Sequence, residues 1–233
     1  MRGCGGMTAV IGRPAVKRTV FATPRAAEFL ELRALQAQTG QPVDAFGDVV
    51  VKELLDNALD AAETADRAPV VEIRTLTYNG LTYVTVTDNG CGIKSETVAQ
   101  ICDFTVLVSD KARYRGPTRG AQGNAFKTLL GIPFALGVTE PITIASDGVR
   151  HELSVSIDAA GGVVVTHNTA TSDRVVGASV TVPLPADMEV DPQRWACGAA
   201  LVNPDAVVTV IDPDYSDDDN EPIFYKPSES GVV

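Results

Sequence analysis

Three carboxylates and one amide recur along Val49–Glu63 (VVVKELLDNALDAAE) at the spacing of a single helix face. Glu53, Asp56, Asn57 and Asp60 occupy positions i, i+3, i+4 and i+7, so a helix would align them as one polar stripe. Such a stripe is self-repulsive unless a cation lies over it, and Mg²⁺ suits oxygen ligands that it shares with substrate phosphates. Taken alone, the stripe is better explained as the solvated face of an amphipathic helix.

A second candidate group begins with Asp88, which ends the β-rich run Leu81–Asp88. The inward face of this run is apolar until it ends in the carboxylate, which could accept a hydrogen bond from the exocyclic amine of a purine. Gly90 and Gly92 follow at once and would let the backbone approach a ligand closely. The same D-x-G-x-G pattern also occurs in ordinary turns.

A third candidate is the polar, basic stretch Ser109–Gln122 (SDKARYRGPTRGAQ), which we expect to be a mobile loop. Gly123 then opens a short predicted helix, Asn124–Leu130, that Gly131–Pro133 should terminate. A glycine-rich loop that leads into a helix start presents unpaired N–H groups and is a suitable phosphate cradle. Together the three groups predict a nucleotide pocket.

The elements that must position these groups follow from periodicity. Arg25–Gln38 should be a helix, and Asp44 is the predicted N-cap of the acidic helix. Val70–Tyr78 and Leu81–Asp88 should be strands joined by a tight turn at Asn79–Gly80. Further strands are predicted at Ile142–Ser146, Arg150–Ile157, Gly162–His167, Ala178–Leu184 and, as the last strand, Ala206–Ile211; further helices are predicted at Ser95–Val108 and Asp191–Val202.

Composition and charge exclude several classes of protein. The 233 residues include 45% hydrophobic and 21% charged residues, as in an ordinary globular protein, and the net charge of -11 argues against broad nucleic-acid contact. Four cysteines without C-x-x-C spacing and only two histidines argue against zinc and fit a reducing cytoplasm. With no apolar run of membrane-spanning length and no signal-peptide core, we expect a soluble cytoplasmic protein that does not bind membranes.

The organisation along the chain divides it into three parts. Residues 1–23 are Gly-rich and basic and should be a flexible arm, whereas residues 24–211 hold the predicted helices and strands. Residues 212–233 are acidic and contain proline, which is typical of a linker or tail.

At these motifs the sequence resembles the GHKL ATPases, the Bergerat-fold group that includes DNA gyrase B, MutL, heat-shock chaperones and histidine kinases. KELLDNALDAAE resembles their N box, DNGCGI their adenine-binding motif, and RGAQGNA their phosphate-binding lid motif. The likeness is greatest to the B subunit of type IIB topoisomerases and covers roughly Thr23–Ile211, while DNGCGI is also similar to MutL. It implies an α/β two-layer sandwich, with a mixed sheet, helices on one face, and ATP between helix and lid.

The resemblance also implies roles for individual residues. Glu53 would be the general base, Asn57 would ligate Mg²⁺ through its amide oxygen, and Asp88 would bind the adenine amine with Gly90 and Gly92 making room for the base. The backbone N–H groups of the lid motif would donate to the phosphates. The other residues implied in ATP binding are Asp60, Ile93, Ser109, Lys111, Gly120, Ala121, Gln122, Gly123, Asn124, Ala125 and Ser179.

Two departures from the family pattern stand out. In the family, a Gly-Thr pair on a late strand provides a threonine that helps to hold an adenine-bound water. This sequence has Gly177-Ala178 there, so the water would be held by Asp88 and the hydroxyl of Ser179. The family's catalytic lysine comes from a following transducer domain, and the expectation is that this chain ends before one. Lys111 is as consistent with a solvated loop lysine as with a phosphate ligand, and Lys127 is better explained as a surface lysine.

The leading hypothesis is therefore Mg²⁺-dependent ATP binding and hydrolysis that drives dimer closure in a machine like topoisomerase VI. The partners expected from the resemblance are a second copy when nucleotide is bound, a downstream domain or partner subunit, and DNA only indirectly. The alternatives are an ATP-gated interaction module with negligible turnover and a MutL-like ATPase. A histidine kinase is disfavoured because the predicted helix Arg25–Gln38 contains no histidine.

Overall fold

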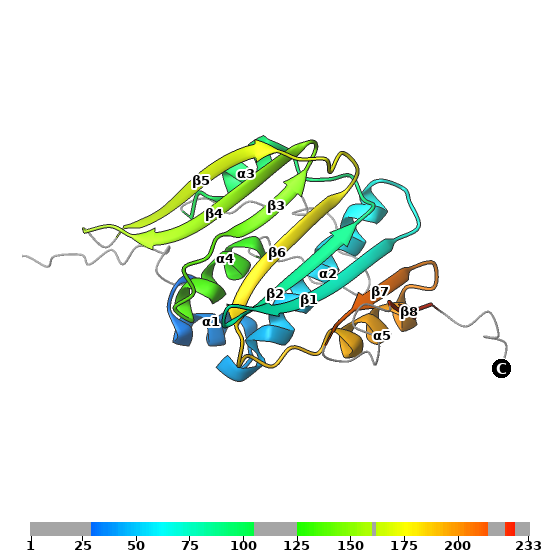
Figure 1. Cartoon of the computed structure of the whole chain (residues 1–233), viewed down its shortest axis with the longest axis horizontal. Helices are drawn as coiled ribbons and strands as arrows, with labels where there is room; N and C mark the ends of the chain where they lie inside the picture. Colours follow the sequence, from blue (N-terminus) through cyan, green and yellow to red (C-terminus); the bar gives the residue numbers. More distant parts are fainter. Residues whose placement is uncertain (1–28, 105–124, 160–161, 214–221, 227–233) are drawn as a thin grey trace, which may run out of the picture.

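The computed structural model describes residues 29–104, 125–159, 162–213 and 222–226. Eight strands form one mixed sheet in the order β5-β4-β3-β6-β2-β1-β7-β8 (Figure 1). Among these strands only β1 and β7 pair in parallel. The strands are β1 (Val70–Tyr78), β2 (Leu81–Asp88), β3 (Ile142–Ser146), β4 (Val149–Ile157), β5 (Val163–Thr171), β6 (Ala178–Pro185), β7 (Val207–Ile211) and β8 (Ile223–Tyr225).

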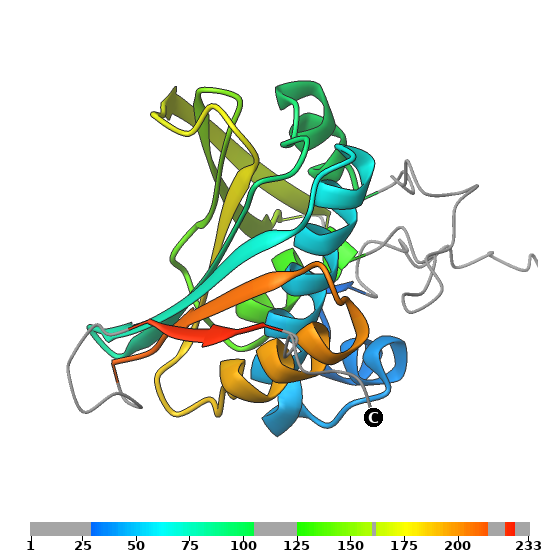
Figure 2. The same ribbon diagram turned by 90° about the vertical axis from the view of Figure 1, so that its right-hand side faces the viewer.

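The helices of the described residues lie together on one face of this sheet, and the other face is left open (Figure 2). This arrangement confirms the predicted two-layer α/β sandwich with a mixed sheet. The helices are α1 (Leu32–Thr39), α2 (Phe46–Thr64), α3 (Ser95–Ile101), α4 (Ala125–Ala135) and α5 (Pro192–Val202), with a short 3₁₀ turn, η2 (Val43–Ala45).

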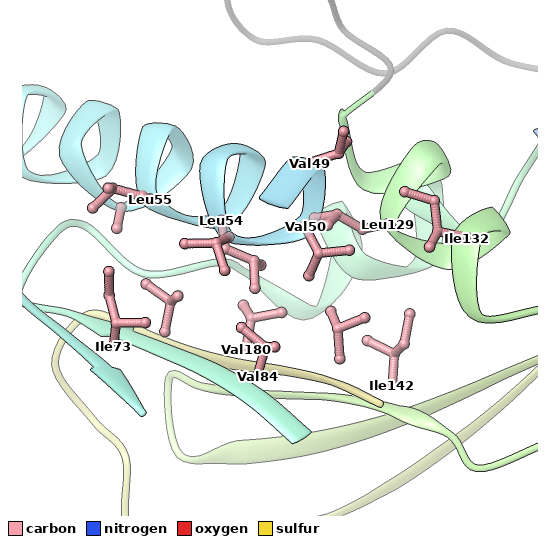
Figure 3. Close-up of a cluster of buried hydrophobic side chains, with 14 of the residues drawn as sticks. Val49, Val50, Leu54, Leu55, Ile73, Val84, Leu129, Ile132, Ile142 and Val180 are labelled. Carbon is pink, nitrogen blue, oxygen red and sulfur yellow. The ribbon is translucent and has the colours of Figure 1, made fainter. Parts of the chain in front are cut away.

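The core lies between α2 and the centre of the sheet. Alternate residues of β2 are buried, as expected for a strand with one covered face, and the apolar arc of α2 meets them. Val50, Leu54 and Leu55 of α2 point toward strand residues that include Ile73, Val84 and Val180, and α4 contributes Leu129 and Ile132 (Figure 3). The most conspicuous helix of the sequence is thus the element on which the two layers pack.

The β1–β2 hairpin has the predicted turn. Asn79 and Gly80 have φ angles of 52° and 79°, so both central residues are left-handed, as a two-residue type I′ turn requires. Because this turn fixes the register, Val71 pairs with Asp88 at the other end of the hairpin. The local signal therefore determines where the Asp88 carboxylate lies.

Three helix boundaries differ from the predictions. Helix α1 spans Leu32–Thr39, and the predicted start of that helix lies outside the described residues. Asp44 is not the N-cap of α2, because it lies within η2 and Ala45 is the residue that precedes the helix. Helix α3 ends at Ile101, well before Val108. Residues 105–108 also lie outside the description.

Helix α4 continues through Gly131 and Pro133 to Ala135, so the prediction that these residues end it at Leu130 was wrong. Packing explains the glycine: a Cβ on Gly131 would lie 1.8 Å from the carbonyl oxygen of Phe29. Pro133 lies in the last turn of the helix, where it has no N–H to donate to the carbonyl oxygen of Leu129, and the helix ends two residues later. Gly131 is therefore a site of close helix–backbone contact.

The sheet also extends beyond the predicted last strand. Ile223–Tyr225 pairs antiparallel with β7, for example Thr209 with Phe224, and forms the edge strand β8. Part of the predicted acidic tail thus belongs to the sheet, while residues 214–221 and 227–233 lie outside the described residues.

Gly131→Ala should lower the free energy of unfolding by about 1–3 kcal/mol, because the added methyl group collides with the Phe29 backbone. Gly198→Ala in α5 is the matched control, since a Cβ there has nothing within 4 Å. Helix propensity alone should make the control more stable by up to about 1 kcal/mol. Chemical denaturation of both variants measures their free energies of unfolding. An equal change in the two variants would contradict the packing argument.

Candidate functional site

Asp88 ends β2 and is 7% exposed, which is rare for a carboxylate without partners. Its Oδ1 accepts two backbone hydrogen bonds, from the N–H of Gly90 at 2.7 Å and from the N–H of Ala178 at 3.2 Å. Among the described residues none donates a hydrogen bond to Oδ2. The carboxylate is therefore held in a fixed orientation and keeps one oxygen for a ligand.

Burial raises the pKa of Asp88 above its ordinary value. The two backbone N–H groups and the charge of Arg174 oppose that rise, because they favour the ionised form. A carboxylate in this setting is an acceptor when ionised and becomes a donor when protonated. The chemistry of the site thus depends on the balance between burial and its neighbours.

The glycine turn after Asp88 is fastened to the end of α2. The N–H of Cys91 donates to the carbonyl oxygen of Ala61 at 3.2 Å, and Arg67 donates to the carbonyl oxygens of Asn89 and Gly90 at 2.7 and 3.2 Å. A Cβ on Gly90 would lie 2.5 Å from Cβ of Ala61, so this glycine is required for close packing against α2. Helix α2 and the turn therefore behave as one unit.

The other side of the turn depends on Ser146, which the sequence analysis did not identify. Its Oγ accepts the N–H of Ile93 at 2.8 Å and donates to the carbonyl oxygen of Gly177 at 2.9 Å, and the side chain is fully buried. Gly92 has a φ angle of 75°, and a Cβ there would lie 2.8 Å from this Oγ. The sequence held one sign of this role: Ser146 is a polar residue at an inward position of β3, where the other inward residues are apolar.

Ser179 does not lie beside Asp88. It pairs across the strands with Thr87, and their hydroxyl oxygens are 2.9 Å apart. Side chains alternate between faces along a strand, so Ser179 and Thr87 point to the open face while Ala178 and Asp88 point to the helices. The prediction that Ser179 supplies a hydroxyl beside Asp88 is therefore corrected. What β6 offers to Asp88 is the backbone N–H of Ala178.

The acidic stripe of α2 is present, but part of it is already neutralised. Nζ of Lys52 lies 2.9 Å from Oδ2 of Asp56 and 3.4 Å from Oε1 of Glu53. Burial acts to lower the pKa of Lys52, but its contacts with Asp56 and Glu53 outweigh burial and raise that pKa. Lys52 is thus a cation over the stripe that the sequence analysis had not considered.

Asn57 is the most suggestive member of the stripe. Its Nδ2 is buried and has no hydrogen-bond partner among the described residues, so the amide is available to a ligand. It lies one turn before Ala61 on the same helix face, and Glu53 lies one turn earlier again. The stripe therefore leads toward the turn that follows Asp88.

The donor set of this stripe fits Mg²⁺. Glu53, Asn57 and Asp60 offer carboxylate and amide oxygens from one helix, which are the ligand types that Mg²⁺ takes. No group of three or more His, Cys, Asp or Glu residues in the described ranges forms a metal cluster. Mg²⁺ usually takes its remaining ligands from water and substrate phosphates, so the stripe suits a shared site.

Most of the predicted phosphate loop lies outside the described residues. Ala125 is the first residue of α4. The remaining predicted ligands of this segment lie outside the described residues: Ser109, Lys111, Gly120, Ala121, Gln122, Gly123 and Asn124.

Lys127, in the first turn of α4, is not the surface lysine that the sequence favoured. It is 2% exposed, and its Nζ lies 5.9 Å from the ring centroids of both Phe29 and Phe104. Burial lowers its pKa, while the charge of Asp103 opposes that shift. Lys127 is therefore a buried cation at the helix that follows the predicted phosphate loop.

The cysteines of the described residues are free thiols: Cys91, Cys102 and Cys197. Burial raises the pKa of Cys102 to about 11, so this thiol stays protonated at neutral pH and is a poor nucleophile.

None of the helices that the structure describes is both long and apolar enough to cross a membrane.

The fold and the arrangement around Asp88 define a GHKL-type ATPase domain. Residues 48–187 match the family described as histidine kinase-, DNA gyrase B-, and HSP90-like ATPase. The chain belongs to this family.

Similar proteins include two groups that act on DNA. Over 174 residues the chain is 29% identical to the B subunit of type 2 DNA topoisomerase 6 from Natronomonas pharaonis, covering 71% of this chain and 22% of that protein. Over 142 residues it is 30% identical to DNA mismatch repair protein MutL of Lactococcus lactis subsp. cremoris, covering 60% of this chain and 20% of that protein. The chain thus spans about a fifth of the length of these relatives.

Ser146→Ala should lower the free energy of unfolding by about 2–4 kcal/mol, because the Ile93 N–H and the Gly177 carbonyl oxygen would both lose a buried partner. Ser154→Ala on the open face of β4 is the control and should change stability by less than about 0.5 kcal/mol. Urea denaturation monitored by circular dichroism compares them. A Ser146 variant as stable as the Ser154 variant would show that these bonds do not hold the turn.

Proposed function

We propose that this domain binds ATP with Mg²⁺ and hydrolyses it, driving dimer closure in a machine that resembles topoisomerase VI. The observation that carries the proposal is the geometry of Asp88. Its Oδ1 is held by two backbone N–H groups, and Oδ2 is left to accept a hydrogen bond at the end of a buried strand. An acceptor in this place suits the exocyclic amine of adenine.

The residues around Asp88 have complementary roles in the proposal. The backbone from Gly92 to Ile93 would border the base, because Ser146 fixes it there and Gly92 has no side chain to obstruct it. Asn57 would hold Mg²⁺ through its amide oxygen. Asp60, on the same face of α2, would lie close to the water ligands of the ion and to the phosphates of ATP. When bound, Mg²⁺ would neutralise charge on the triphosphate. Gly120, Ala121, Gln122, Gly123, Asn124 and Ala125 would supply the phosphate contacts, with Ser109 and Lys111 nearby.

Glu53 would act as the general base that orients the attacking water and accepts its proton. Lys52 donates to Oε1 of Glu53 at 3.4 Å, so one oxygen of this carboxylate already has a hydrogen-bond partner. Productive catalysis would therefore need Lys52 to remain with Asp56, at 2.9 Å, and release Glu53.

The same contact favours a second candidate, an ATP-gated interaction module with negligible turnover. Lys52 donates to Oε1 of Glu53, so this oxygen already has a hydrogen-bond partner, and the domain could bind ATP and dimerise without rapid hydrolysis. A binding isotherm for ATP measured beside steady-state phosphate release separates the two functions. The identity shared with MutL keeps a mismatch-repair-type ATPase as a variant of the first function.

The assembly is likewise part of the proposal. Because the chain spans about a fifth of its relatives, we propose that a downstream transducer-like domain or partner subunit supplies the catalytic lysine. We propose residues 1–23 as an arm and 24–211 as the ATPase domain, to which β8 adds an edge strand, and the rest of 212–233 as the connection to that partner. We also propose that the domain forms a homodimer when nucleotide is bound and that it acts on DNA only indirectly. The free thiols support a location in a reducing cytoplasm.

Asp88→Asn should weaken ATP binding about tenfold to hundredfold, because an amide nitrogen can present a donor where the adenine amine needs an acceptor. The control is Asp187→Asn, which alters an exposed carboxylate after β6 and should bind like the unchanged protein. Isothermal titration with a non-hydrolysable ATP analogue measures both. Unchanged affinity in Asp88→Asn would remove Asp88 from the adenine site.

Glu53→Ala should retain nucleotide binding and lose about 10²–10⁴-fold in phosphate release, the usual cost of removing a general base. Glu72→Ala changes a carboxylate of β1 that faces the open side of the sheet and serves as the control. Both variants are compared by single-turnover phosphate release at saturating ATP. Equal rates in Glu53→Ala and its parent would make Glu53 part of a solvated acidic face.

A further inference from the structure

The loop between β5 and β6 sends an arginine to the main chain of Asp88. The Nη2 group of Arg174 donates to the carbonyl oxygen of Asp88, although the two residues are 86 positions apart. Ala178, the residue of β6 at which this loop ends, donates its N–H to Oδ1 of Asp88. The loop and the start of β6 therefore contact both the carbonyl oxygen and the carboxylate of the residue on which the proposed base recognition depends.

Arg174 itself is held by three hydrogen bonds that involve its neighbours. Its N–H donates to Oγ of Ser172 at 3.1 Å, and its carbonyl oxygen accepts the N–H of Gly148 at 2.8 Å. The N–H of Ser172 in turn donates to the carbonyl oxygen of Gly148 at 2.9 Å. The guanidinium is thus carried by a backbone that is tied to the β3–β4 turn, unlike the long exposed side chain of a surface arginine.

The loop and Asp88 approach as closely as a backbone allows. Gly177 has a φ angle of 65°, and a Cβ there would lie 2.0 Å from the carbonyl oxygen of Asp88. Only glycine fits this position, so the Asp88 peptide is enclosed between Gly177 and the Arg174 guanidinium.

The arrangement is not the one that stability alone would favour. Nε of Arg174 is buried and has no hydrogen-bond partner among the described residues, which is an unfavourable environment for a charged donor. A local feature that conflicts with stability often marks a functional position. The structure also shows an electrostatic benefit: burial raises the pKa of Asp88, and the charge of Arg174 opposes that rise beside the larger effects of the Gly90 and Ala178 N–H groups.

We infer that Arg174 is a positioning residue for Asp88: it holds the main chain of that residue and places a positive charge beside its carboxylate, and so strengthens the preference for a purine with an amine at C6 over one with a carbonyl. This inference rests on the proposed ATP site and names a residue that supports the base preference of Asp88. A protonated Asp88 would present a donor, which suits the carbonyl oxygen of hypoxanthine instead of the amine of adenine.

The sign of the pH effect follows from the charges around Asp88. Burial raises the pKa of Asp88, and removing Arg174 would raise it further. As the pH is lowered, the variant would therefore become protonated, and lose the acceptor form, at a higher pH than the parent. Other charged side chains on the surrounding elements include Asp60 and Glu63 of α2, Arg67 after it, Asp147 of the β3–β4 turn and Asp173 of the loop. Arg67 contacts the carbonyl oxygens of Asn89 and Gly90, whereas Arg174 is the charged residue that lowers the pKa of the Asp88 carboxyl.

The test compares ATP with inosine triphosphate, which differs in having a carbonyl in place of the amine. Both are titrated calorimetrically into the full chain and into Arg174→Gln from about pH 5 to about pH 8. Arg150→Gln is the matched control, because Arg150 pairs with Glu152 on the open face of β4. Arg174→Lys tests whether the charge alone suffices.

In Arg174→Gln we expect ATP affinity to fall about tenfold or more and the ATP-to-ITP preference to shrink, as for loss of a charge-assisted contact. The loss of ATP binding on acidification should begin at higher pH than in the parent, with Arg174→Lys intermediate and Arg150→Gln unchanged. A uniform loss of affinity for both nucleotides, with the same pH profile, would overturn the inference and leave Arg174 a merely structural residue.

A second measurement does not depend on nucleotide. The Asp88 carboxyl is titrated by carbon-13 NMR in the nucleotide-free chain and in both Arg174 variants. Arg174→Gln should raise the Asp88 pKa, and Arg174→Lys should raise it less; an unchanged pKa would overturn the inference even if ATP binds. If the unchanged protein binds neither nucleotide while this pKa responds, the proposed function fails and the positioning role stands. Arg174→Lys also covers the case in which the glutamine variant does not fold.

Discussion

The burial of one carboxylate constrains much of this structure. A carboxylate removed from water must be paired, and Asp88 is paired by backbone N–H groups from its own turn and from β6. Those donors exist only because β6 lies beside β2 in the sheet and because the turn curls back over the strand end. The sheet order and the glycine turn are thus requirements of the same buried charge, and both are met by residues far apart in sequence.

The two faces of the sheet separate binding residues from structural ones. Along β6, Ala178 points to the helices and Ser179 to the open face, so adjacent residues have unrelated roles. On β3 the inward position opposite Ala178 holds Ser146, which places a hydroxyl close to the turn. The family's threonine is absent, but the same region holds a buried hydroxyl that braces the backbone of the base site.

Local signals made much of the fold and part of the site predictable. The hairpin turn, the period of α2 and the carboxylate that ends β2 are each determined by a few neighbouring residues, and each was found where it was expected. Gly131 and Lys127 were misjudged because their environments are made by Phe29, which comes from a distant part of the chain. Arg174 carried no signal at all, since nothing near it in sequence shows that its loop folds back onto Asp88.

The charges of the site suggest that nucleotide binding and turnover are separately controlled. Asp88, at one end, is held by Arg174 and by backbone groups of the fold. Glu53, two turns before Ala61 on α2, shares a lysine with Asp56. The proposed base-recognition residue is therefore fixed by the fold itself, whereas the proposed general base would have to be freed from Lys52.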